Sequence, residues 1–292
     1  MFELADLLVS LMFYGTAYGM VLYLLAVGLS VTLGLMRFIN LAHGVFAMTG
    51  GYLTVTAMSR FGVPFLVAVL VAVVVVGAFG MLLERTLCRR LYAASLLEQV
   101  LFSIGLIFVS IAIARYIFGP LAQPITLPGW LTGRVNVGIG VFPTYRVFLV
   151  GVGAVLAIAI WAGIERTRFG ASVRAAVDNR RMAESVGINV NLVFTVCFGL
   201  GTALAALGGS LGADLLPIYP GYPNDYLVYF LIVVAVAGVG NVRGALAVAL
   251  AFGIADTMIR YFLPGFGRVL IFLLVMAVLF RNPHGFAPKI HA

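Results

Sequence analysis

The chain has 292 residues, of which 63% are hydrophobic and only 10% are charged. A soluble domain carries about 25% charged residues, so this composition excludes a soluble fold and indicates a protein whose solvent is lipid. The net charge of +8 does not indicate nucleic-acid binding. The arginines stand singly or in small groups between apolar runs, which is the pattern of a membrane protein with one face in the cytoplasm.

Nine charge-poor segments follow one another along the chain as candidate membrane spans. A helix needs roughly 20 apolar residues to cross about 30 Å of hydrocarbon. The first segment is long for one crossing, the second is short, and charged residues interrupt the last two. The candidates are 7–36, 45–59, 62–83, 99–118, 147–164, 192–213, 226–239, 245–262 and 269–280.

These segments predict an all-α fold, a single polytopic transmembrane helix bundle over residues 1–292 with about eight or nine spans. The excess of Lys and Arg marks cytoplasmic loops, and placing 84–98 and 165–191 inside puts 12 of these residues in the cytoplasm and 6 outside. The N-terminus is then outside and the C-terminus cytoplasmic. Inverted repeats around a central path, which many transporters use, stay open as an arrangement.

The loop at 119–146 is rich in Pro and Gly and faces out in this orientation. It is either a plain surface loop or a docking surface for an extracytoplasmic partner. In the segment 245–262, Asp256 and Arg260 stand one helical turn apart and are expected to pair near the outer end of their helix.

The cytoplasmic loop at 165–191 is the most informative stretch. Its residues 173–186 predict one helix, supported by two i,i+4 ion pairs that each contribute a few tenths of a kcal/mol. Those pairs are Arg174 with Asp178 and Arg180 with Glu184.

One face of this predicted helix carries small residues, Ala176, Ala183 and Gly187. Gly187 is suited to end the helix in the left-handed conformation. A short charged helix with a flat face fits a groove on another protein, and the alternative is a solvated connector between two spans.

Polar residues also interrupt the first half, where Asn40, His43 and Gly44 stand between a long apolar run and a short one. A broken or re-entrant helix would expose polar groups near membrane depth at such a point. The alternative is a cytoplasmic turn with a helix cap and a structural, hydrogen-bonded histidine.

Catalytic chemistry is poorly supported. The single Lys, Lys289, follows no glycine-rich loop, so the chain has no P-loop for ATP, and its His and Cys residues are not at metal-ligand spacing. The stretch from Gly208 to Gly212 fits a nucleophile motif around Ser210. Within an apolar helical run it predicts instead a small-residue packing face, as do the pairs Gly15–Gly19 and Gly240–Gly244.

Two stretches resemble one family of transporters. RAAVDNRRMAESVGI, at 174–188, resembles the cytoplasmic loop of ABC-importer permeases of the branched-chain amino acid type, the LivH group, and GLSVTLGLMRFINLAHGVFAMTGGYL, at 28–53, resembles that family's strongest signature. The glycine-rich AGVGNVRGAL at 237–246 and the closing RNPHGF agree more loosely. In that signature the matching residues are Gly34, Arg37, Asn40, Ala42, His43 and Gly44.

The resemblance implies a helix in the cytoplasmic loop that docks on an ATPase subunit. It also implies a permease of the bacterial cytoplasmic (inner) membrane in an ATP-driven, binding-protein-dependent importer of branched-chain amino acids, or of amides or urea. Two ABC ATPase subunits would hold ATP and Mg inside, beside a second related permease, with a substrate-binding protein outside. The matching positions of the coupling helix are Arg174, Ala175, Asp178, Ala183, Gly187 and Ile188.

The charge pattern, the His and Cys spacing and the missing P-loop predict that this chain itself binds no nucleic acid, metal or cofactor. Asn40, His43 and Gly44 are expected near the substrate path. Two rival classes stay open at this point. One is a self-sufficient secondary transporter or channel for a small solute, and the other is a membrane-embedded enzyme that uses Ser210 or His43.

Overall fold

The computed structural model describes residues 2–36, 38, 40–92, 94–138 and 140–282. Arg37, the closing motif from 283 onward and Lys289 lie outside the described residues. Within the described part the fold is helical apart from one antiparallel hairpin, β1 (Arg134–Asn136) with β2 (Val141–Pro143), in which Val135 lies opposite Phe142. This confirms the all-α prediction.

The helices follow in the order expected from the apolar segments. They are α1 (Phe2–Met36), α2 (His43–Phe61), α3 (Phe65–Thr86), η1 (Cys88–Leu91), α4 (Leu96–Phe118), η2 (Gly129–Leu131), α5 (Thr144–Arg166), α6 (Arg168–Asp178), α7 (Arg180–Ser185), α8 (Val190–Gly212), α9 (Tyr222–Ala237), α10 (Val242–Phe262) and α11 (Gly267–Arg281).

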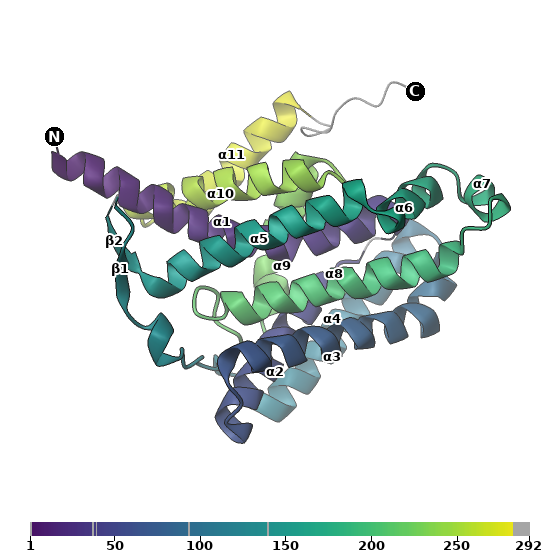
Figure 1. Ribbon diagram of the computed structural model, residues 1–292, viewed down its shortest axis with the longest axis horizontal. Coiled ribbons are helices and arrows are strands. Elements are labelled where there is room, and N and C mark those ends of the chain that lie inside the picture. The colour runs from purple at the N-terminus through teal and green to yellow at the C-terminus, as the bar shows by residue number, and fades with distance from the viewer. Residues whose placement is uncertain (1, 37, 39, 93, 139, 283–292) are drawn as a thin grey trace.

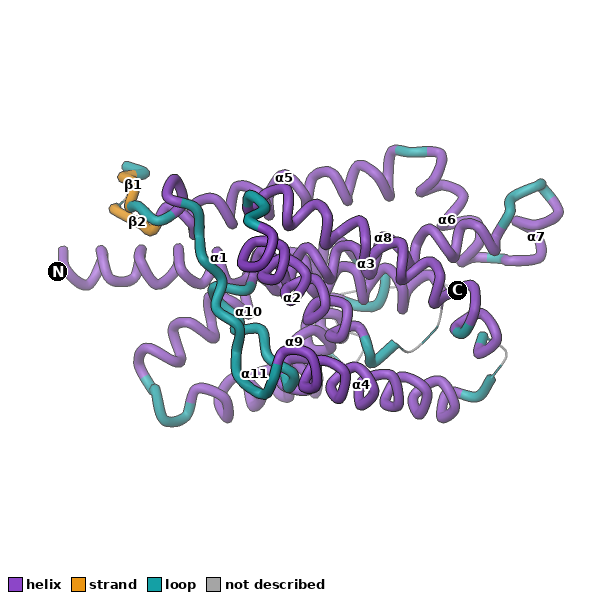
Figure 2. Tube along the Cα trace, turned by 90° about the horizontal axis from the view of Figure 1, so that it is seen from below, coloured by secondary structure: helices purple, strands orange, loops and turns teal. Residues whose placement is uncertain are grey.

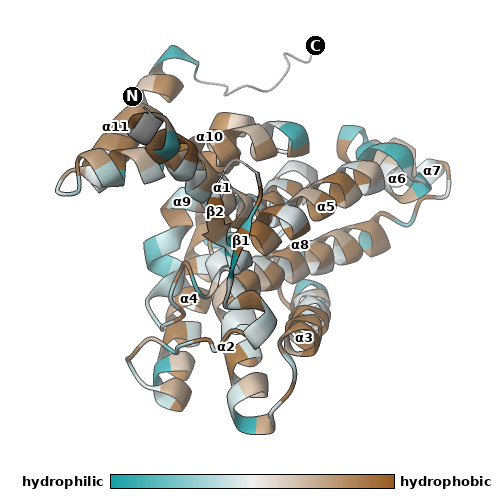
Figure 3. Cartoon of the chain, turned by 60° about the vertical axis from the view of Figure 1, so that its left-hand side comes forward, coloured by the Kyte–Doolittle hydropathy of each residue, from teal (hydrophilic) through white to brown (hydrophobic). Residues whose placement is uncertain are grey.

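Six of the described helices, α1, α3, α4, α5, α8 and α10, are long and apolar enough to cross a membrane. The helices α9 and α11 are apolar but shorter, and α2 is mostly buried inside the bundle. Each of the nine predicted segments therefore overlaps a helix, although only six meet both criteria. Figure 3 shows mostly hydrophobic residues along α3, α5 and α8 and a group of hydrophilic residues at α6.

The two long loops lie at opposite ends of the bundle. In Figure 1 the hairpin and the N-terminus are at one end, and α6 and α7 are at the other. The connection after α4 crosses the bundle to reach the hairpin beside α5 (Figure 2), and Gln123 within it pairs with Ile218 after α8. The first end is called the hairpin end below, and the second the α6–α7 end.

The centre of the bundle is α8, which packs on α1, α2 and α3. A Cβ atom added to Gly209 would lie 2.0 Å from the carbonyl oxygen of Ala47 in α2, and one added to Gly28 of α1 would lie 2.4 Å from that of Gly201. Lipid gives no hydrophobic drive for helices to associate, so such close backbone approach supplies the packing energy.

The predicted packing face from Gly208 to Gly212 is confirmed, because these glycines meet Leu25 and Val21 of α1. Ser210 between them is buried, and its oxygen accepts a hydrogen bond from Thr54 Oγ1 at 2.8 Å. The hydroxyl is thus engaged within a helix and not presented on a strand–turn–helix elbow, which counts against the enzyme interpretation.

A second close crossing joins α1 to α10. An added Cβ on Gly15 would lie 2.5 Å from Ile254 Cα, and one on Gly19 would lie 2.7 Å from Ala249 O, so that packing prediction is also confirmed. Gly240 and Gly244 do not share one helix face, because Gly240 has φ +81° and lies in the turn that follows the end of α9 at Gly238. Gly240 nevertheless packs closely on α1, since a Cβ added to Gly34 would lie 2.5 Å from Gly240 Cα.

Replacing Gly209 with alanine tests the α2–α8 contact. The added methyl group has no space against the α2 backbone, so the variant should lose about 1–3 kcal/mol of stability, as overpacked cores do. Gly105→Ala on α4 is the matched control, since nothing lies within 4 Å of its added Cβ. Thermal unfolding in one detergent should rank Gly209→Ala below wild type and Gly105→Ala level with it; equal melting temperatures would contradict this packing model.

Candidate functional site

The polar residues of the first half lie at a break between α1 and α2. Asn40, His43 and Gly44 are all buried, and His43 Nε2 donates to the carbonyl oxygen of Leu25 at 3.0 Å. The turn has no capping side chain, since Ala42 occupies the N-cap of α2. The histidine is therefore held by a hydrogen bond inside the bundle. The alternative of a turn with a helix cap is not supported, because α2 has no side-chain cap at its start.

The break lies deep in the bundle. Helix α1 continues for 11 residues beyond Leu25, which is about 16 Å at 1.5 Å per residue, so α2 starts well below the end of α1. An added Cβ on Gly44 would lie 3.0 Å from Pro223 Cα in the first turn of α9. The first turns of α2 and α9 thus meet inside the protein, as the broken-helix interpretation expects. The contact of Asn40, His43 and Gly44 with substrate stays a prediction.

The loop at 165–191 differs from its prediction, because it forms two helices and not one. Asn179 has an extended backbone, and its side chain accepts a hydrogen bond from Met182 N at 3.0 Å, which starts α7 anew. An asparagine that caps the backbone in this way competes with helix continuation. The predicted helix at 173–186 is therefore divided into the end of α6 and the whole of α7.

Gly187 ends α7 in the left-handed conformation, as predicted. Gly187 has φ +86°, its N–H donates to Glu184 O at 3.1 Å, and Ile188 N–H donates to Ala183 O at 3.0 Å. This is the hydrogen-bond pattern of a Schellman motif.

Of the two predicted ion pairs in the loop, Arg180 with Glu184 is confirmed at 3.0 Å. The pairing of Arg174 with Asp178 is wrong, because the Arg174 guanidinium donates to the carbonyl oxygen of Ile164 at the end of α5. That carbonyl is one of the last in its helix and has no partner within it.

Two residues of the small-residue face, Ala176 and Ala183, are buried against the chain itself, so they cannot form the surface offered to a partner, whereas Gly187 is exposed in the turn after α7. The exposed apolar residues here are Met182 of α7, 63% exposed, and Val186, its C-cap, 70% exposed. They stand four residues apart, and Val186 N–H donates to Met182 O at 3.2 Å, so both lie on one side of the short helix.

A polar network anchors α7 to the bundle. The Arg180 guanidinium, beside its pairing with Glu184, donates to Asn191 Oδ1 at 3.1 Å at the start of α8. Arg89 of η1 donates to Thr195 Oγ1 one turn further along, at 3.0 Å, and also pairs with Glu84 at 3.5 Å.

Glu84 is fully buried at the end of α3 and accepts hydrogen bonds from Thr195 at 2.6 Å and from Tyr92 at 2.8 Å. The carboxylate thus joins α3, η1 and α8. Glu84 was not predicted as a site residue. A carboxylate directly at the end of an apolar span, as Glu84 is after 62–83, is the sequence signal that could have indicated it.

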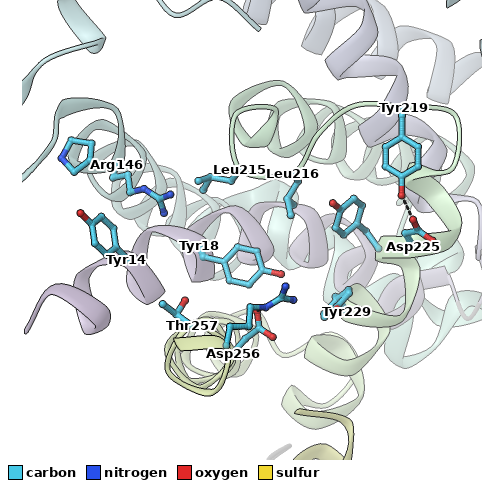
Figure 4. Close-up of a pocket in the computed structure, with 13 residues that line it drawn as sticks. Tyr14, Tyr18, Arg146, Leu215, Leu216, Tyr219, Asp225, Tyr229, Asp256 and Thr257 are labelled. Atoms are coloured by element: carbon cyan, nitrogen blue, oxygen red, sulfur yellow. Dashed lines mark hydrogen bonds and ion pairs between the residues drawn. The ribbon is translucent and has the colours of Figure 1, made fainter. Parts of the chain in front are cut away.

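At the hairpin end a cavity of about 560 Å³ opens between α1, α5, α9 and α10. Figure 4 shows Tyr18 and Tyr229 near Asp256 of α10. Asp256 accepts from Arg260 Nε at 2.6 Å, which confirms the predicted pair. The lining residues are Tyr14, Tyr18, Pro143, Arg146, Leu215, Leu216, Tyr219, Asp225, Tyr226, Tyr229, Asp256, Thr257 and Arg260.

Comparison with known proteins gives one consistent result. A family model described as the permease component of the branched-chain amino acid transport system matches residues 11–279. The chain is 28% identical to the high-affinity branched-chain amino acid transport system permease protein LivH of Escherichia coli (strain K12), over 94% of this chain and 93% of that protein.

Two other similar proteins show the same extent of match. Permease protein BraD of Pseudomonas aeruginosa, from a high-affinity branched-chain amino acid transport system, is 29% identical over 93% of this chain and 92% of its own length. A probable branched-chain amino acid transport permease, LivH of Methanocaldococcus jannaschii, is 26% identical over 92% and 89%. No solved structure matches the chain at a comparable level of significance.

The buried carboxylate at the α6–α7 end generates a stability prediction. Glu84→Gln removes the charge that Arg89 pairs with and unbalances a buried hydrogen-bond network, so it should lower the free energy of unfolding by about 1–3 kcal/mol. The matched control is Glu165→Gln, which breaks an exposed pair with Arg243 and should cost less than about 1 kcal/mol. If thermal unfolding showed the same loss of stability in Glu84→Gln and Glu165→Gln, burial of Glu84 would contribute nothing to stability.

Proposed function

The chain belongs to the branched-chain amino acid transport permease family, and from that premise we propose that it is the transmembrane subunit of an ATP-driven, binding-protein-dependent importer. The proposed substrates are branched-chain amino acids, the class that the names of its relatives carry. As a permease component the chain is not itself an enzyme, so ATP and Mg belong to two partner ATPase subunits.

The proposed orientation places the α6–α7 end in the cytoplasm of a bacterial inner membrane and the hairpin end outside. The excess of Arg at 165–191 supports this, as does the position of that loop opposite the hairpin (Figure 1). A substrate-binding protein would then dock at the hairpin end, where the loop at 119–146 and the cavity lie. A second permease subunit would complete the path.

The observation that carries this proposal is the exposed apolar pair on α7. Met182 and Val186 are exposed apolar residues among exposed residues that are otherwise charged or polar, and α7 lies at the far tip of the bundle in Figure 1. Apolar anchors with polar surroundings are typical of a protein–protein contact. We assign these two residues, in place of the buried Ala183, as the contact with the ATPase subunit.

The anchoring network gives this contact a route into the bundle. Arg180 ties α7 to Asn191 at the start of α8, and α8 packs along α1, α2 and α3. A displacement of α7 by the ATPase would therefore shift α8, the helix against which the others pack. Because glycines hold these backbones in contact, α8 moves with its neighbours as a packed unit.

Charge substitution on α7 tests the docking surface. The permease carrying Met182→Asp and Val186→Asp, co-expressed with the ATPase and second permease subunits of its own organism, should fail to co-purify with the ATPase and should lose ATP-driven leucine uptake. A buried charge without a partner costs several kcal/mol at an interface. Leu121→Asp, an exposed site at the hairpin end, is the control that should keep the ATPase bound.

The rival transporter class predicts a different behaviour. The purified chain alone in liposomes should take up no leucine under a proton or sodium gradient, and uptake should begin only when the ATPase and second permease subunits, binding protein and ATP are present. Gradient-driven uptake by the chain alone would replace the importer proposal with a secondary transporter.

A further inference from the structure

The cavity at the hairpin end contains an ion pair with unused bonding capacity. Asp256 is 2% exposed, yet it lies in the wall of a cavity of about 560 Å³. Its Oδ2 atom accepts a hydrogen bond from Arg260 Nε, but its Oδ1 atom is buried and has no hydrogen-bond partner among the described residues. A buried carboxylate oxygen without a donor is costly, so Asp256 keeps unused acceptor capacity in the wall of the cavity.

Arg260 has capacity left as well. Its pairing with Asp256 uses Nε, which leaves the four N–H groups on Nη1 and Nη2 at the free end of the guanidinium. That end is the planar fork that binds a carboxylate with two parallel hydrogen bonds. The side chain is 49% exposed, so a solute in the cavity can reach it.

The other two charged groups that line the cavity, Arg146 and Asp225, stand apart from each other (Figure 4). The guanidinium of Arg146 lies over the ring of Tyr14, 4.9 Å from its centroid, and the carboxylate of Asp225 accepts from the Tyr219 hydroxyl. Figure 4 shows that last contact at the far side of the cavity from Tyr14. The pair Asp256–Arg260 is thus the position where a free acceptor and a free carboxylate-binding fork stand side by side.

We propose that this cavity binds a free α-amino acid, with its ammonium group on Asp256 and its carboxylate on Arg260. An α-amino acid carries both charges on one carbon atom, so its two groups match an acid and a base that are themselves adjacent. The proposal rests on the importer function above and adds to it the residues that bind the substrate on this chain.

Aromatic walls suit the apolar side chain of such a substrate. Tyr18 and Tyr229 line the cavity beside the ion pair, and Leu216 closes one side. Rings and methyl groups bind branched aliphatic side chains through buried apolar area, while the ion pair fixes the end of the molecule that all amino acids share. Charged groups at membrane depth are functional candidates by default.

The test uses the reconstituted complex of this chain with its ATPase and second permease subunits, supplied with leucine-loaded binding protein. The readout is the number of leucine molecules imported per ATP hydrolysed, measured only in preparations whose subunits co-purify. Asp256→Asn and Arg260→Lys should each lower this ratio by about tenfold, which is the value of one charge-assisted hydrogen bond. Asp6→Asn and Arg115→Gln, both exposed at the same end, should leave it at the wild-type value.

A double variant separates binding from a structural role. In Asp256→Leu with Arg260→Met the ion pair is replaced by apolar side chains of similar size, which often leaves stability unchanged. An assembled double variant with a strongly lowered ratio supports the binding site. A double variant with a wild-type ratio would overturn it, as would an Arg260→Lys complex with a wild-type ratio.

Two further outcomes are distinguishable. A phosphatidylethanolamine headgroup also carries an ammonium and an acidic group, so loss of this co-purified lipid from Asp256→Asn at an unchanged leucine ratio would assign the cavity to lipid and overturn the proposal. Failure of the wild-type chain to co-purify with any ATPase would instead overturn the importer function itself.

Discussion

Close backbone contact between α8 and its three neighbours is the constraint on which the rest of the structure depends. Inside a bilayer the apolar surface of a helix gains little by leaving lipid for protein, so helices associate through contact at short range. At Gly209 and at Gly28 the neighbouring backbone occupies the space where a side chain would begin. The positions of α1, α2 and α3 are thereby fixed relative to α8, and the two ends of the bundle are fixed relative to each other.

Two buried carboxylates, Glu84 and Asp256, lie at opposite ends of this apolar bundle. At the α6–α7 end Glu84 accepts hydrogen bonds from Tyr92 and Thr195 and pairs with Arg89, so both of its carboxylate oxygens have partners. At the hairpin end Asp256 has only one oxygen bonded. The same kind of residue thus serves two purposes, and the difference lies in how completely its bonding capacity is used within the chain.

The cytoplasmic loop shows how local and tertiary effects combine. Asn179 restarts the helix and Gly187 ends it, and both follow from side-chain chemistry next to the backbone. Which side of α7 is buried does not follow from these two residues. Arg180 attaches α7 to Asn191, eleven positions further along the chain, in an orientation that buries Ala183 and exposes Met182. Of the small residues that predicted a docking face, Ala176 and Ala183 are buried and Gly187 is exposed.

The sequence by itself determined the class of the fold, the position of the helices, the family, the turn at Gly187 and the packing role of Gly208 and Gly212. These depend on composition, on the length of apolar runs and on local backbone preference, all of which can be read along one chain. The tertiary structure decided which polar residues are satisfied: it placed Ser210 against Thr54, paired Arg174 with the end of α5 and not with Asp178, and left one buried oxygen of Asp256 without a hydrogen-bond partner. Those outcomes depend on which segments distant in sequence come within about 3 Å of each other, the reach of a hydrogen bond, and no pattern along the chain contains that distance.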